Sequence, residues 1–255
     1  MSDKTVLIVS GFDPFNLAGY GSDIRVVTKI GANPLGVITA LTNQDPNEVL
    51  SILSIDANFI KQQLDSIFLN TQIGSIKIGM LYSRKIIEVV ASFLKGFKGE
   101  IVVDPIFRAT KGHDLIHYES VSLFKDLILK SATIITPNIP EAIALTGVNE
   151  STNEQCELLY NMFTSSVLLK GGHGRINDKN ELIDTLYTGK EFFYFSRNKV
   201  SDINTHGTGC MLSTAIASYL ALGFDKVRAI KKAQNFLTNS LNNPIKMGSD
   251  KYLSH

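Results

Sequence analysis

The chain has 255 residues, which suits one α/β domain built around a single sheet. Its hydrophobic fraction is 44%, its charged fraction is 19% and its net charge is +1, a balance typical of a soluble globular protein. A nucleic-acid or other polyanion-binding surface is excluded on these grounds, because such surfaces need an excess of basic residues.

Short apolar runs alternate along the chain with longer amphipathic ones, which is typical of a parallel sheet with crossover helices. The short runs predict strands at Thr5–Ser10, Leu35–Thr39, Ser75–Ile78, Glu100–Val103, Thr133–Thr136 and Ser166–Lys170. The amphipathic runs predict helices at Ser22–Ile30, Asp56–Leu69, Arg84–Leu94, Glu119–Leu129, Ile139–Thr146 and Glu154–Phe163.

The last third of the chain changes pattern. Asp184–Tyr187 and Phe192–Phe195, joined by a turn with a glycine, predict a β-hairpin. Two helices follow, at Gly207–Leu222 and Asp225–Leu241. No linker or repeat interrupts this order, so we expect residues 1–255 to form one doubly wound α/β domain with helices on both faces of a mostly parallel sheet.

The N-terminal apolar run is too short for a signal peptide or a membrane span. The two cysteines, Cys156 and Cys210, lie far apart and without metal-type spacing, and the histidines show no ligand spacing, so no structural zinc is predicted. Cys156 shares a predicted helical face with apolar residues and is expected in the core. These features favour a cytoplasmic protein.

Polar or glycine-rich segments follow six predicted strands, where a ligand binds in such folds. Ordinary loop chemistry explains any one of them, but six at one sheet edge predict a binding site. The segments are Gly11–Asp13, Thr42–Gln44, Gly79–Met80, Asp104-Pro105, Pro137-Asn138 and Gly171-Gly172-His173.

The segment Asn204–Cys210, with the sequence NTHGTGC, carries the strongest chemical signal and runs directly into a helix of small residues. Gly207 and Gly209, on either side of Thr208, let the backbone turn its amides outward, and the helix start adds partial positive charge. This pattern predicts an anion hole for a transferring phosphoryl group, although a tight connection into a helix would look the same.

Cys210 falls in the first turn of that helix, where the helix dipole is expected to lower the thiol pKa toward neutrality. A thiolate there could take the proton from an attacking hydroxyl. The alternative is a buried, inert cysteine.

Asn138 and Glu141 have the spacing of a reciprocal helix cap, which alone would account for both. The functional alternative places Glu141 beside Mg²⁺ that keeps most of its waters.

At these motifs the sequence resembles the ribokinase superfamily, whose members end in a Gly-x-Gly-base anion hole and carry an Asn-x-x-Glu element. Most members have aspartate as the base. The cysteine within NTHGTGC is instead typical of the hydroxymethylpyrimidine/phosphomethylpyrimidine kinases of thiamine biosynthesis. The resemblance extends in order from Gly11 to about Gly223, with Ile76–Leu81, Val103–Pro105 and Leu169–His173 among the matching stretches.

The resemblance implies a kinase that uses ATP and Mg²⁺, phosphorylates 4-amino-5-hydroxymethyl-2-methylpyrimidine and then its monophosphate, and associates as a homodimer. It implies catalytic roles for Gly207, Thr208, Gly209 and the base Cys210, and metal-side roles for Asp104 and Glu141. It implies nucleotide contacts for Asn138, Lys170 and Thr205, and a pyrimidine pocket formed by Gly11, Ala18, Gln44, Met80 and Ile106.

The sequence departs from the family at Phe15–Leu17, where a glycine-rich substrate loop is usual and only Ala18-Gly19 remains. Pyridoxal or pyridoxine kinase activity is therefore an alternative, as is a catalytically weak pyrimidine-binding regulatory protein. Arg108 either pairs with a substrate phosphate or faces solvent. A cysteine hydrolase is disfavoured, because His206 precedes Cys210 by four residues across a glycine turn.

Overall fold

The computed structural model describes residues 4–45, 48–109, 112–171, 181–200, 203–247 and 250–254. A nine-stranded sheet has the order β3-β2-β1-β4-β5-β6-β7-β8-β9. Neighbouring strands from β2 to β7 run parallel, whereas β3, β8 and β9 pair antiparallel. The strands are β1 Thr5–Phe12, β2 Asn33–Gln44, β3 Val49–Ser54, β4 Ser75–Ile78, β5 Glu100–Val103, β6 Ile134–Ile135, β7 Ser166–Leu169, β8 Glu181–Tyr187 and β9 Phe192–Asn198.

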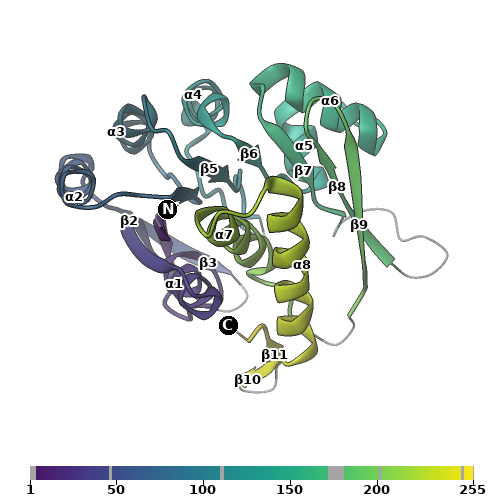
Figure 1. Ribbon diagram of the computed structural model, residues 1–255. Helices are drawn as coiled ribbons and strands as arrows, with labels where there is room; N and C mark the ends of the chain where they lie inside the picture. The colour runs from purple at the N-terminus through teal and green to yellow at the C-terminus, as the bar shows by residue number, and fades with distance from the viewer. Residues whose placement is uncertain are drawn as a thin grey trace.

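Helices cover both faces of this sheet (Figure 1). One face carries α1 Gly19–Ile30, α7 Thr208–Ala221 and α8 Lys226–Asn242. The other carries α2 Ala57–Asn70, α3 Arg84–Leu94, α4 Val121–Leu127, α5 Ile139–Thr146 and α6 Thr152–Phe163. The expected doubly wound α/β fold with a β-hairpin is confirmed.

Alternation along the buried strands explains this two-sided arrangement. In β1, Leu7 and Val9 pack with α2 and α3, whereas Val6 and Ile8 pack with α1, α7 and α8. Successive strand residues point to opposite faces, so a strand apolar throughout must be covered on both sides. The parallel order of β1, β4, β5, β6 and β7 brings their carboxyl ends to one edge.

Three details of the fold differ from the sequence predictions. β2 continues through Thr42–Gln44, a segment expected beyond the strand end, because it pairs with the unpredicted edge strand β3. The predicted helix Glu119–Leu129 is broken into 3₁₀ turns at Tyr118–Ser120 and Leu129–Ser131 on either side of α4. A second hairpin, β10 Ile245–Met247 with β11 Asp250–Tyr252, was also not predicted.

Among the residues that the structure describes, no helix combines the length and the apolar character needed to cross a membrane.

Candidate active site

Two acidic side chains and one lysine meet beyond β5, β6 and β7. Lys170 Nζ lies 2.8 Å from Asp104 Oδ1 and 3.8 Å from Glu141 Oε2. Both carboxyl groups are nearly buried. Burial alone would lower the pKa of Lys170, but the charges of Asp104 and Glu141 raise it above its usual value. The lysine therefore remains a cation between two acids.

The spacing of Asn138 and Glu141 forms the predicted reciprocal cap of α5. The Asn138 side chain accepts a hydrogen bond from the Glu141 amide at 2.8 Å, and Glu141 Oε2 accepts one from the Asn138 amide at 2.8 Å. Asn138 also forms an isolated β-bridge with Lys170. The cap consequently fixes the Glu141 carboxyl beside the lysine, so the structural interpretation is confirmed and the magnesium role of Glu141 stays a prediction.

The glycine loop begins α7 directly over this charged group. Gly207 is the N-cap and has φ +88°, the left-handed conformation that favours glycine. A β-carbon on Gly209 would lie 3.2 Å from Lys170 Nζ and 3.4 Å from Asp104 Oδ2. Because a helix leaves its first amides without intrahelical partners, this arrangement has the chemistry to hold an anion next to the lysine. Thr208 N–H donates to the carbonyl of Thr205 at 3.2 Å and Met211 N–H donates to that of Gly207 at 2.9 Å, so the first-turn amides left for an anion are those of Gly209 and Cys210.

Cys210 lies in the first turn of α7 and is buried, with 8% of its surface exposed. The expectation of a lowered thiol pKa was wrong for the unliganded protein. Burial raises the pKa of Cys210 to about 11, and Asp104 and Asp23 add to the rise. Lys77 and the Gly19 amide, which donates to the sulfur, oppose it without overcoming it.

The predicted pyrimidine residues Gly11 and Met80 lie in contact at the ends of β1 and β4. A β-carbon on Gly11 would be 2.8 Å from Met80 Sδ, so any larger residue here would force the Met80 side chain to move. Gly19, with φ +62°, packs equally tightly on the Gly11 carbonyl. Ala18 immediately precedes it, and its amide donates to Asp13 Oδ2 at 3.0 Å. These residues join the substrate side of the site to the start of α1.

Asp13, which the sequence analysis did not single out, organises the divergent loop. Its carboxylate accepts hydrogen bonds from the amides of Phe15, Leu17 and Ala18 at 2.8 to 3.0 Å. Leu17 is buried, and its carbonyl would lie 1.9 Å from a β-carbon on Gly207. The altered loop is therefore packed against the anion hole. An Asp-Pro pair after a strand is a turn signal that could have indicated this role.

The remaining predicted residues lie further from these contacts or on the surface. Gln44 Oε1 accepts a hydrogen bond from Thr42 at 3.0 Å in β2, and the Ile106 amide bonds back to the Asp104 carbonyl at 2.8 Å. Thr205 is exposed. Arg108 pairs with Asp114 at 2.7 Å on the surface. Gly172 and His173 lie outside the described residues.

Sequence reasoning also missed the hydroxyls that surround Asp104. Thr136 Oγ1 donates to Asp104 Oδ1 at 3.2 Å, and Ser213 Oγ approaches Oδ2 at 3.5 Å. His206 donates its amide N–H to the Asn204 side chain at 2.9 Å. Its buried Nε2 lies 3.8 Å from Asp13 Oδ2 and has no hydrogen-bond partner among the described residues.

The position of Glu141 gives the folded protein a pH dependence. Burial raises the pKa of Glu141 from 4.5 to about 7, with Asp104 adding to the rise and Lys170 opposing it. A raised carboxyl pKa gives stability that is complete below about pH 4.5 and lost as pH rises through about 7.

We therefore expect Glu141→Gln to have a melting temperature that falls less than that of the wild type between pH 5 and pH 8, by a few degrees. Thermal denaturation at several pH values measures this. Parallel curves for the two proteins would contradict the assignment.

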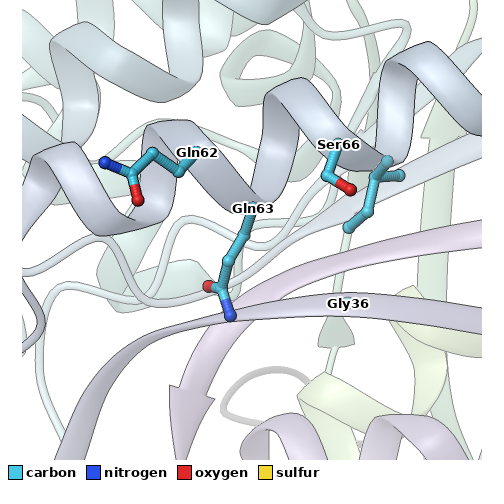
Figure 2. A pocket seen from close by; sticks show the side chains of 5 residues that line it. Gly36, Gln62, Gln63 and Ser66 are labelled. Carbon is cyan, nitrogen blue, oxygen red and sulfur yellow. The ribbon is translucent and has the colours of Figure 1, made fainter.

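A surface pocket lies elsewhere, between β2 and α2 (Figure 2). It is lined by Gly36, Gln62, Gln63, Ser66 and Ile67, all different from the residues predicted for the site.

A mostly parallel sheet whose edge presents a glycine anion hole, a paired lysine and two acids defines a ribokinase-like small-molecule kinase. The phosphomethylpyrimidine kinase family model matches residues 13–255, and the chain belongs to that family.

The hydroxymethylpyrimidine/phosphomethylpyrimidine kinase of Aquifex aeolicus is 37% identical over 95% of this chain and 96% of its own length. Among solved structures, phosphomethylpyrimidine kinase from Clostridium difficile 630 has a TM-score of 0.80 at 30% identity, covering 93% of this chain and 99% of that one. An ADP complex of Bacillus subtilis pyridoxal kinase has a TM-score of 0.86 at 25% identity, covering 98% and 96%. The family resemblance seen in the sequence is confirmed.

Proposed function

We propose that this protein transfers the γ-phosphoryl group of ATP to 4-amino-5-hydroxymethyl-2-methylpyrimidine and then to the resulting monophosphate, as in thiamine biosynthesis. The observation that carries the proposal is the Gly207–Cys210 loop placed over Lys170 and Asp104 within this family's fold. The loop supplies amides and the lysine supplies a fixed charge where a phosphoryl group would pass.

Each residue has a distinct part in this transfer. The amides that follow Thr208 hold the oxygens of the moving phosphoryl group, and Lys170 neutralises part of its charge. Gly11 and Met80 form a close-packed wall for the ring, with Gln44 offering a donor and an acceptor to the aminopyrimidine edge. Positioning and charge stabilisation account for most of the rate enhancement in this type of reaction.

Cys210 is the proposed base, which takes the hydroxyl proton as the oxygen attacks phosphorus. Its buried position and high pKa mean that the thiol is protonated in the unliganded protein at neutral pH. It first releases a proton to water, and the sulfur then accepts the substrate proton while the bond between the β- and γ-phosphates breaks and ADP leaves.

The acids beside Lys170 fit a magnesium ion held through water. Mg²⁺ prefers oxygen ligands and keeps several waters, and the Asp104 oxygens already accept hydrogen bonds from Lys170 and Thr136. Asp104 and Glu141 would hold it from the protein side. When bound with the nucleotide, the ion would neutralise part of the negative charge of the phosphates.

Product analysis tests the function. With ATP and the hydroxymethylpyrimidine, we expect mass spectrometry to show a monophosphate first and a diphosphate later. Supplying the monophosphate should give the diphosphate directly. Binding of the pyrimidine without any phosphorylated product would instead favour the regulatory, non-catalytic alternative.

A further inference from the structure

A buried ion pair lies beneath the proposed base and has no part in the mechanism so far. Lys77, in β4, has its Nζ 2.6 Å from Asp23 Oδ2 in α1, and both side chains are completely buried. Thr214, in α7, donates to the other Asp23 oxygen at 2.6 Å. The pair therefore joins the sheet to both helices.

The first turns of these same two helices contain Gly19 and Cys210. Thr214 follows Cys210 by one helical turn in α7, and Asp23 follows Gly19 by one turn in α1. The Gly19 amide donates a hydrogen bond to the Cys210 sulfur. A β-carbon on Gly79 would lie 3.0 Å from Lys77 Nζ, which places the ammonium toward the carboxyl end of β4, where the site is.

Stability alone gives little reason for this pair. A buried ion pair can often be replaced by apolar residues without loss of stability, because both charges must be removed from water. The neighbours of Lys77 in β4, Ile76 and Ile78, are apolar and buried. A charge at this position in a packed strand suggests a use for the charge itself.

The charged groups around Cys210 come from several elements. Lys77 approaches from β4, Asp23 from α1 and Asp104 from the end of β5, while Lys170 follows β7. Burial raises the pKa of Cys210, and Asp104 and Asp23 raise it further. Lys77 is the strongest influence that lowers it. Burial alone would lower the pKa of Lys77, but the charges of Asp23, Cys210 and Asp104 raise it.

We propose that Lys77 is a positioning residue for phosphoryl transfer, whose buried ammonium stabilises negative charge on the Cys210 sulfur while Asp23 and Thr214 hold it in place. This inference rests on the base role proposed for Cys210. Lys77 itself does not touch the reacting groups, and its contribution is electrostatic.

Two single variants, Lys77→Met and Asp23→Asn, separate a charge effect from a structural one. The rate at which iodoacetamide alkylates Cys210 at pH 8 reports the fraction of thiolate. It is measured by peptide mass spectrometry on the protein without substrate. A neighbouring opposite charge shifts a pKa by about 1 to 3 units, and Lys77 is the charge that lowers the pKa of Cys210 most, so Lys77→Met should react at least about tenfold more slowly than the wild type. In Asp23→Asn the charges of Asp104 and of the Cys210 thiolate still favour the Lys77 ammonium, while a competing anion is removed, so this variant should react faster.

A purely structural role of Lys77 gives a different pattern. Weakening the contact between β4, α1 and α7 would expose the Cys210 thiol and speed its alkylation in both variants. Turnover provides a second measurement: Lys77→Met should lower kcat while leaving the KM for ATP close to that of the wild type. Alkylation of Lys77→Met at or above the wild-type rate would overturn the inference. If Lys77→Met does not fold, Asp23→Asn provides the test. Unchanged or slower alkylation of Cys210 in Asp23→Asn would also overturn the inference.

The inference and the proposed base role fail separately. An inactive Cys210→Ser together with unchanged alkylation in Lys77→Met removes only the role of Lys77. Full activity of Cys210→Ser removes the base role, and with it the catalytic role of Lys77.

Discussion

Replacing Cys210 with serine is expected to lower kcat by about 10² to 10⁴-fold, the range typical for loss of a general base. Serine keeps nearly the same volume and can accept the Gly19 hydrogen bond, so the first turns of α1 and α7 should stay in place. KM for ATP should change little, because Lys170 and Asn138, which are expected to contact the nucleotide, are untouched. Steady-state kinetics with ATP and the pyrimidine measures both constants.

Cys156 provides the matched control for this variant. It is buried in α6, where burial raises the pKa of its thiol to about 12. Cys156→Ala should leave kcat unchanged and cost some stability from the lost packing. Equal turnover for Cys210→Ser and the wild type would show that another group accepts the proton.

Replacing Gly207 with alanine is expected to lower kcat/KM by at least about 10²-fold, comparable to the loss of an oxyanion-hole donor. The new β-carbon would lie 1.9 Å from the Leu17 carbonyl oxygen, so either the substrate loop or the start of α7 must move. The left-handed φ of +88° adds strain for any residue with a side chain. Kinetic assays and thermal melting of the same preparation give both effects.

Gly31→Ala is the control for Gly207→Ala, because it has the backbone strain without the steric clash. Gly31 has φ +91°, but a β-carbon there would meet nothing within 4 Å. We expect Gly31→Ala to lose about 1 kcal/mol of stability and to keep full activity. An active Gly207→Ala would mean that contact between the loop and the anion hole is not required.

The sequence predicted most of the fold because its buried strands are apolar on both faces. β4 and β5 have the predicted bounds, and α3 and α5 do as well. The edge strand β3 was missed, since Leu50 and Leu53 are exposed there and burial imposes no clear alternation. The helix predicted at Glu119–Leu129 failed because pattern alone does not show where hydrogen bonding changes to a 3₁₀ turn.

The candidate site divides in a similar way. The family motifs identified Asn138, Glu141 and Cys210, because those residue types occur at fixed spacing. They did not indicate that burial would raise the thiol pKa, since desolvation depends on the packing of α1 against α7. Lys77 also pairs with a residue far away in the sequence, Asp23, although a lysine inside an apolar strand is a signal that the sequence already contained.

The preference for the pyrimidine over pyridoxal is measured most directly by a competition assay with ATP, in which the hydroxymethylpyrimidine and pyridoxal are present together. The ratio of their phosphorylated products gives the ratio of kcat/KM for the two acceptors. We expect strong preference for the pyrimidine, through the close-packed Gly11 and Met80 and the Asp13-anchored loop. Preference for pyridoxal would contradict it and assign this chain the activity of its pyridine-phosphorylating structural neighbours.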